Sequence, residues 1–197
     1  KDSPTFMSSD HYGHLVTRTG ALWTPQGHSF DGVDDYLDAG NGASLNITIA
    51  ITIEAWIYWI GTTTYAIIAE KGNGVAGYVM YLDETDSNLQ FHLITDTQNT
   101  SDGADASTLS HNTWHHIVVT YDGSKKDLYI GGRLSKSFSP RTGTITTSAN
   151  PFTIAKRSNI NYLFNGLISE VLIYNRALSA NEIIQHYLSA KRRMPWL

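Results

Sequence analysis

The sequence predicts an all-β protein built as a sandwich of two antiparallel sheets, followed by one short helix. Short segments in which apolar and polar residues alternate recur between turn signals along most of the 197 residues. Ile, Tyr and Trp, which suit pleated surfaces, are frequent. Sandwiches of this length usually fold around one core, so we expect a single domain over residues 1–197.

The alternation also predicts which side chains of each strand point away from the core. In the segment 51–59, Ile51, Ile53, Ala55 and Ile57 are expected to face the space between the sheets. The segments 89–93 and 114–121 repeat the pattern, with Leu89, Phe91 and Leu93, and then Ile117, Val119 and Tyr121, inward. The side chains that alternate with these inward residues point away from the core. We expect six of them to share one face: Glu54, Trp56, Tyr58, Gln90, His92 and His116.

Turn and helix signals complete the outline. Asp122-Gly123 and Gly131-Gly132 are typical of tight turns, and the polar segment 95–109 is expected to be an exposed loop. Ser179 with Glu182 forms a capping box, and an apolar stripe at helical spacing predicts a helix over about residues 179–190. Residues 191–197 are then expected to form a short basic tail.

Composition excludes several classes of function. The formal net charge is −4 and the pI is about 6.0, which argues against a nucleic-acid partner. The chain has no cysteine, so disulfides, thiolate metal sites and cysteine nucleophiles are excluded. No apolar run approaches the length that membrane insertion requires.

Four motifs follow one another along the chain: residues 29–37 (SFDGVDDYL), 53–57 (IEAWI), 114–123 (WHHIVVTYDG), and 164–171 (FNGLISEV) with 174–179 (YNRALS). In this order they resemble the laminin-G-like jelly-roll family of the concanavalin A-like lectin/glucanase superfamily. The resemblance spans roughly residues 8–190. It implies a concanavalin A-like jelly roll that binds glycans or proteins on one sheet face or on rim loops, often with calcium.

The first motif contains a candidate calcium site. Asp31, Asp34 and Asp35 crowd one turn, and carboxylates that close repel one another unless a cation or backbone donors neutralise them. Hard cations take six to eight oxygen ligands, so the carbonyl of Gly32 and the side chains of Ser169 and Glu170 are further candidates. The family tends to have Asp where this chain has Ser169, which weakens that half of the site. The alternative is that Asp31 only caps the turn.

The outward set of six residues is the candidate ligand-binding site. Aromatic rings offer apolar faces to pyranose C–H groups, while amide, carboxylate and imidazole groups can hydrogen-bond hydroxyls. We therefore expect Glu54, Trp56, Tyr58, Gln90, His92 and His116 to bind carbohydrate. The alternative is that Trp56 and His116 are covered by neighbouring segments and only pack.

No residues are assigned to catalysis. Retaining glycanases need two carboxylates about 5 Å apart, and Glu54 has Thr52 and Trp56 at the positions two residues away on its face. A glycoside hydrolase or polysaccharide lyase is therefore the weaker alternative to a binding module.

The expected location is extracellular, on a cell surface or on a virion surface, with a glycan or a surface protein as partner. The other alternative is a structural subunit of an appendage, fibre or virion, forming homo-oligomers through its terminal segments, such as Met194–Leu197.

Overall fold

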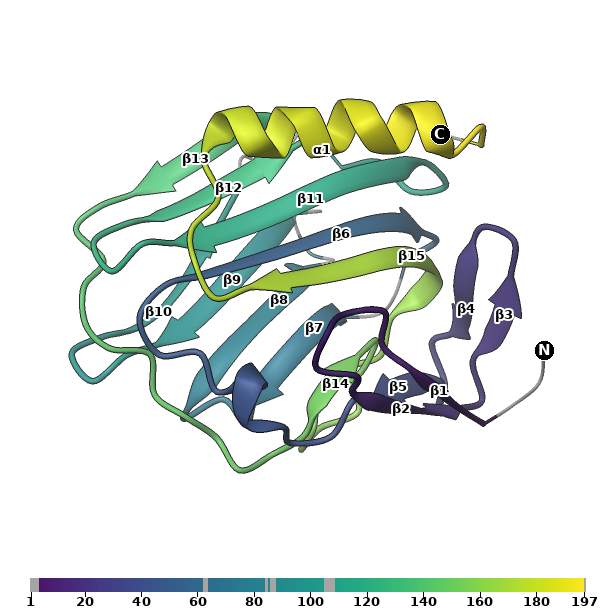
Figure 1. Cartoon of the computed structure of the whole chain (residues 1–197), viewed down its shortest axis with the longest axis horizontal. Coiled ribbons are helices and arrows are strands. Elements are labelled where there is room, and N and C mark those ends of the chain that lie inside the picture. Colours follow the sequence, from purple (N-terminus) through teal and green to yellow (C-terminus); the bar gives the residue numbers. More distant parts are fainter. Residues whose placement is uncertain (1–3, 62–63, 84, 86–87, 105–108, 197) are drawn as a thin grey trace.

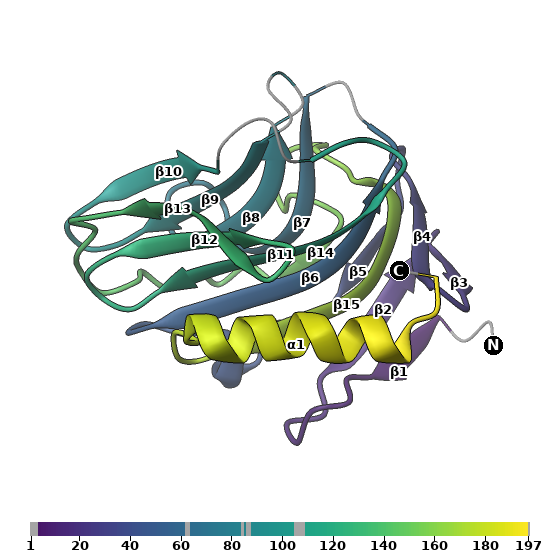
Figure 2. The ribbon, with the colours of Figure 1, turned by 90° about the horizontal axis from the view of Figure 1, so that it is seen from above.

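The computed structural model describes residues 4–61, 64–83, 85, 88–104 and 109–196. Within them, two antiparallel sheets pack face to face, as Figures 1 and 2 show. In spatial order, the eight-stranded sheet contains β1 (Thr5–Met7), β2 (Leu15–Thr19), β5 (Tyr36–Asp38), β14 (Phe152–Ile154), β7 (Tyr65–Gly72), β8 (Gly77–Asp83), β9 (Asn88–Ile94) and β10 (Asn99–Gly103).

The second sheet has seven strands. In spatial order they are β13 (Arg133–Phe138), β12 (Lys126–Ile130), β11 (Trp114–Tyr121), β6 (Ile51–Trp59), β15 (Asn165–Tyr174), β4 (Gly27–Asp31) and β3 (Leu22–Thr24). A short 3-10 helix, η1 (Ala43–Leu45), precedes β6, and the helix α1 (Ala180–Arg193) follows β15. The predicted all-β sandwich with a C-terminal helix is confirmed.

The core lies between the sheets and follows the predicted phases. Ile51, Ile53, Ala55 and Ile57 of β6 are all fully buried. The inward sets predicted for β9 and β11 belong to the same core cluster, namely Leu89, Phe91, Leu93, Ile117, Val119 and Tyr121. Period-two alternation was therefore sufficient to orient these three strands.

The helix α1 packs on the outer face of the seven-stranded sheet (Figure 2). Ser179 caps it as predicted, because its side chain accepts from the Glu182 N–H while the Glu182 side chain accepts from the Ser179 N–H. Ile183 is buried in a small cluster with Val118 and Tyr129, which point outward from β11 and β12. The outer face of this sheet thereby becomes a second, smaller core.

The boundary between helix and tail was predicted wrongly. The helix continues through Arg193, so the basic residues 191–193 form its last turn. Positive charge near a helix C-terminus interacts favourably with the helix dipole, and this favours the extra turn. Met194 is buried and Trp196 is half-buried, so the described part of the tail folds back on the protein.

The hairpin between β12 and β13 supports the helix. Gly131 and Gly132 have φ values of 58° and 75°, in the left-handed region that glycine adopts without strain, as predicted from the pair. A Cβ atom added to Gly132 would lie 2.8 Å from Ile184 Cδ1 and 2.9 Å from Tyr187 Cβ. Gly132 therefore also provides the space into which α1 packs.

The predicted exposed loop at 95–109 is partly wrong, because β10 (Asn99–Gly103) lies within it and pairs with β9. Residues 105–108 lie outside the described residues. The strand NTSDG is polar because it lies at the edge of its sheet with most of its side chains exposed or half-buried. Such a strand lacks the apolar alternation by which strands are recognised.

A buried lysine joins the two sheets beneath β10. Lys126 of β12 is fully buried and its Nζ lies 2.7 Å from an Asp102 carboxylate oxygen of β10. The same ammonium donates to the carbonyls of Phe91 and Thr100, at 2.8 and 3.0 Å. Arg141 donates two further hydrogen bonds to Asp102. An ammonium group from one sheet is thus satisfied by two strands of the other.

Candidate functional site

The structure divides the six predicted ligand-binding residues between opposite sides of the sandwich. Glu54, Trp56, Tyr58 and His116 lie on β6 and β11 of the seven-stranded sheet. Gln90 and His92 lie on β9 of the eight-stranded sheet. The prediction that they share one face is wrong, because alternation shows which side chains point away from the core but not to which sheet a strand belongs.

Three of the four residues on β6 and β11, Glu54, Trp56 and His116, lie beneath α1. The ring of Trp56 stacks on Tyr187, with centroids 5.6 Å apart, and Trp56 is 3% exposed. The Glu54 carboxylate accepts from His116 Nε2 at 2.7 Å and from His186 Nδ1 at 2.8 Å. Burial acts to raise the pKa of Glu54, but these hydrogen bonds outweigh it and lower the pKa. Trp56, Glu54 and His116 are therefore packing residues.

A pocket of about 200 Å³ remains beside this buried cluster. Its lining residues come from the helix and from three strands of the sheet and their connecting segments: Trp56, Trp114, His115, His116, Ile130, Gly131, Tyr187 and Lys191. Tyr58 is half-buried against Trp114, with ring centroids 5.8 Å apart. Trp56 and His116 line this pocket but offer it almost no exposed surface.

The outer face of the eight-stranded sheet is different, because α1 packs on the other sheet. We call the surface formed by β7 to β10 and the segment 155–164 the open face. Three tyrosine rings gather there: Tyr65 lies edge-on to Tyr81 at 5.4 Å and edge-on to Tyr162 at 5.0 Å. All three tyrosines are half-buried, so each residue remains partly accessible to solvent.

Polar groups lie beside these rings. Gln90 of β9 is directly opposite Tyr81 of β8, and both are half-buried. The Tyr81 hydroxyl lies 2.7 Å from the Ser101 hydroxyl, and His92 Nε2 lies 2.6 Å from Asn99 Oδ1. Burial lowers the pKa of His92 and raises the pKa of Tyr81, so both side chains are uncharged at neutral pH. The face therefore offers neutral hydrogen-bonding groups next to aromatic surface.

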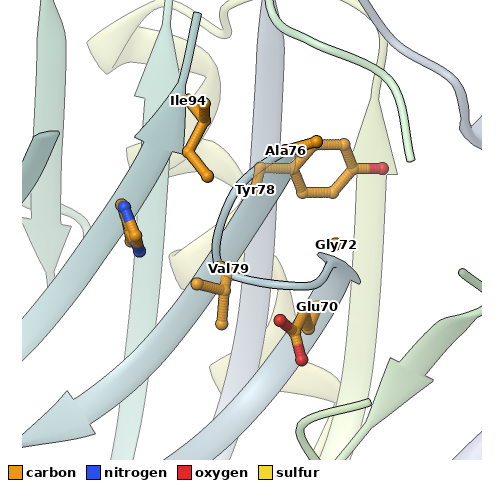
Figure 3. A pocket seen from close by; sticks show the side chains of 9 residues that line it. Glu70, Gly72, Ala76, Tyr78, Val79 and Ile94 are labelled. Carbon is orange, nitrogen blue, oxygen red and sulfur yellow. The ribbon is translucent and has the colours of Figure 1, made fainter. Parts of the chain in front are cut away.

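A buried carboxyl group lies at one side of the open face, in the shallow pocket that Figure 3 shows around Glu70, Val79 and Ile94. Glu70 is 1% exposed, and its carboxylate accepts from the Ser158 N–H at 3.0 Å. Arg157 Nε is 3.7 Å from the other carboxylate oxygen. Burial raises the pKa of Glu70 to about 7, despite the opposing effects of Ser158 and Arg157.

Sequence reasoning missed most of the open face. Glu70 ends an apolar run, and a register irregularity between Ile67 and Ala69 breaks the alternation that would have placed it outward. Arg157 and Tyr162 belong to an irregular segment that carries no periodic signal. Tyr81 was detectable, because it stands between the inward residues Met80 and Leu82.

The acidic turn is formed as the sequence predicts. Carboxylate oxygens of Asp31, Asp34 and Asp35 lie within 4.8 Å of one another. Asp31 Oδ1 accepts from the N–H groups of Val33 and Asp34, and Asp35 Oδ2 accepts from the Asp31 N–H. Burial, followed by the charges of Asp31 and Asp34, raises the pKa of Asp35 against the effect of the Asp31 N–H. Asp31 therefore caps the turn, and several carboxylate oxygens remain for a cation.

Ser169 and Glu170 do not complete this site, so that part of the predicted metal set is wrong. The residue of β15 opposite Asp31 is Asn165, and the strand carries Ser169 and Glu170 away from the turn. Ser169 contacts Met194, and Glu170 pairs with Arg193. Asn165 adjoins the turn, because a Cβ atom added to Gly32 would lie 2.9 Å from Asn165 Cβ.

Comparisons with known proteins agree with this architecture. Residues 31–184 match a laminin-G family model described as the concanavalin A-like lectin/glucanases superfamily. A search of curated protein sequences gives no match.

Among solved structures, the chain resembles the binding domain of botulinum neurotoxin serotype G, with a TM-score of 0.76 and 16% identity over 94% of this chain and 48% of that one. The ligand-binding domain of serotype D, in complex with N-acetylneuraminic acid, gives the same TM-score and identity over 93% and 48%. This chain thus spans about half the length of these structures, and the likeness shows the fold.

Proposed function

This chain belongs to the concanavalin A-like lectin/glucanases superfamily, and from that premise we propose that it is a non-catalytic, extracellular carbohydrate-binding module. We place its ligand on the open face, around Tyr81, Gln90 and His92. The observation that carries the proposal is the gathering of three tyrosine rings and neutral polar side chains on the sheet that α1 leaves uncovered. Tyrosine combines an apolar ring for sugar C–H groups with a hydroxyl for hydrogen bonding.

Two observations favour binding over glycoside hydrolysis. Retaining and inverting glycosidases use paired carboxylates across the sugar. The residues directly opposite Glu70 on the two neighbouring strands are Thr153 of β14 and Val79 of β8, and neither is a carboxylate. The buried carboxylate of Glu54 lies beneath α1 on the opposite sheet, away from the open face. The module is expected to act outside the cell, and no helix among the described residues is long and apolar enough to cross a membrane.

Glycan-array binding of the fluorescently labelled chain tests the proposal. Tyr81→Ala is expected to weaken glycan binding roughly tenfold, because the loss of one aromatic contact costs about 1.4 kcal/mol of binding free energy. Tyr81→Phe keeps the ring and should retain most binding. Tyr12→Ala removes a tyrosine that is 57% exposed outside the open face, and serves as the control. Folded protein that binds no glycan, or Tyr81→Ala that binds as well as the unchanged chain, would refute the proposal.

We also propose that the acidic turn binds calcium, with oxygens of Asp31, Asp34 and Asp35, the Gly32 carbonyl and the neighbouring Asn165 as candidate ligands. The convergence of three carboxylates and the raised pKa of Asp35 support a cation there, because a divalent ion would neutralise the repulsion. Calcium should raise the melting temperature of the chain, and Asp34→Asn should abolish that rise. An unchanged melting temperature at saturating calcium would exclude the site.

Assembly is the second candidate function, and the exposed apolar residues of the first strands favour it. Phe6 and Met7 of β1 and Leu22 and Trp23 of β3 are 37–67% exposed, on strands that form one edge of each sheet. Sedimentation at increasing concentration tests this function. Association that Trp23→Ser prevents would support an assembly role, whereas a monomer at high concentration would count against it.

A further inference from the structure

Glu70 and Arg157 on the open face form an incomplete ion pair. Within the described residues, neither Glu70 Oε1 nor Arg157 Nε has a hydrogen-bond partner, although both atoms are buried. Their separation of 3.7 Å exceeds the roughly 2.7–2.9 Å typical of a charged hydrogen bond. Buried polar groups are normally hydrogen-bonded. The guanidinium is therefore only partly neutralised by the protein itself.

Arg157 is held in place yet remains accessible. Its side chain is 17% exposed, and its Cζ lies 6.0 Å from the centroid of the Tyr162 ring. A Cβ atom added to Gly74 would lie 2.4 Å from Arg157 Nη2, so the glycine allows the guanidinium to lie against the backbone. The positive charge is thus positioned beside the tyrosine rings rather than free in solvent.

We propose that the open face selects glycans that carry a carboxylate group, that Arg157 binds this group, and that Glu70 competes with the ligand for the guanidinium. The inference rests on the proposed function, because it names the ligand class of the same surface. A planar guanidinium matches a carboxylate with two parallel hydrogen bonds, and such charge-assisted bonds are stronger than neutral ones.

The groups that face Glu70 determine whether the binding of acidic glycans strengthens or weakens as the pH falls. Arg157 is the charged neighbour, and burial lowers the pKa of His92 in the same pocket, which favours the neutral form of that imidazole. Thr153 of β14, Val79 of β8 and the turn 72–77 carry no titratable side chain. Below pH 7, protonation of Glu70 leaves Arg157 without a competing carboxylate. Acidic glycans should therefore bind about tenfold more tightly at pH 6 than at pH 8, following the protonated fraction of Glu70.

The test uses an array in which each sialylated or uronate-containing glycan is printed beside its neutral parent and its sulfated counterpart. The full chain is measured at pH 6 and pH 8. Arg157→Gln should lose the preference for acidic over neutral glycans, and Glu70→Gln should bind acidic glycans equally at both pH values. Arg192→Gln removes an exposed charge on α1 and should behave as the unchanged chain.

The outcomes separate this inference from the proposed function. Preference for acidic glycans that Arg157→Gln removes supports the inference. Binding of neutral or sulfated glycans alone, or acidic binding that Arg157→Gln leaves intact, overturns it while the carbohydrate-binding function stands. Retention of no glycan at either pH overturns both. If Glu70→Gln fails to fold, the pH dependence of the unchanged chain decides, and equal affinity for acidic glycans at pH 6 and pH 8 refutes the role of Glu70.

Discussion

Replacing Asp102 with Asn should strongly destabilise the protein, because it leaves the ammonium of Lys126 buried without an opposite charge. Lys126 is fully buried, and in the variant only neutral acceptors remain for it, namely the carbonyls of Phe91 and Thr100 and the amide oxygen of the new side chain. Removing one partner of a buried ion pair costs about 3–5 kcal/mol. Burial already lowers the pKa of Lys126 to about 8 against the effect of Asp102, which shows how strongly the site disfavours the charge.

Proton release limits this loss. Deprotonating a lysine whose ordinary pKa is about 10.4 costs about 1.36 kcal/mol for each unit by which that pKa exceeds the pH, or roughly 5 kcal/mol at pH 7. At pH 9 the same release costs only about 2 kcal/mol, so the destabilisation of Asp102→Asn should shrink as the pH rises. The pH dependence therefore distinguishes an unpaired lysine from a loss of packing, which would be the same at both pH values.

Urea unfolding followed by tryptophan fluorescence measures these differences. Arg141→Gln is the matched control, since it removes the more exposed partner of Asp102 and leaves Lys126 paired. It should cost no more than about 1–2 kcal/mol. A loss below about 1 kcal/mol for Asp102→Asn at pH 7, or an equal loss at pH 7 and pH 9, would refute the reasoning.

Three further predictions concern stability. Glu70 keeps its proton in the folded state up to about pH 7, whereas the unfolded chain releases it near pH 4.5, so the free energy of unfolding falls as the pH rises through this window. Glu70→Gln removes this loss, and the variant should therefore be up to about 3 kcal/mol more stable than the unchanged chain at pH 8 and equally stable at pH 4. Chemical unfolding at both pH values measures the difference. Gly132→Ala should lose about 2 kcal/mol or more of stability, because the new methyl group meets Ile184 and Tyr187. Gly131→Ala, whose new methyl group would meet no atom of the described residues within 4 Å, should lose only about 1 kcal/mol. Equal losses in thermal melts would show that the hairpin does not support α1. Ser179→Ala should cost about 1 kcal/mol through the lost cap, and unchanged melting would contradict that assignment.

The sequence was sufficient for the fold because burial imposes a period on the strands that form the core. Ile51 to Ile57 alternate without interruption, and their inward phase follows from that pattern alone. Ser179 and Glu182 likewise determine where α1 begins, since a capping box is a local interaction. Its end was less predictable, because Arg193 also pairs with Glu170 of β15, a contact between residues distant in sequence.

The candidate site was harder to predict because it depends on which strands are neighbours. Trp56 and His92 both alternate outward, yet one lies beneath α1 and the other on the opposite sheet. Arg157 reaches Glu70 from a segment 87 residues further along the chain, and no local pattern marks that meeting. Residues distant in sequence can be predicted to share a face when they belong to a periodic pattern, and Arg157 and Glu70 do not belong to one.

The ammonium of Lys126 also bears on how the module would resist force. The edge strand β10 forms part of the open face and, among the strands that the structure describes, is hydrogen-bonded to β9 alone. A ligand pulled away from this face would load β10 first, and an edge strand can peel from its sheet one hydrogen bond at a time. Because Lys126 holds Asp102 and the Thr100 carbonyl from the far sheet, peeling must also break a buried ion pair. We therefore expect β10 to yield together with the sandwich rather than before it, as the proposed binding role would require under load.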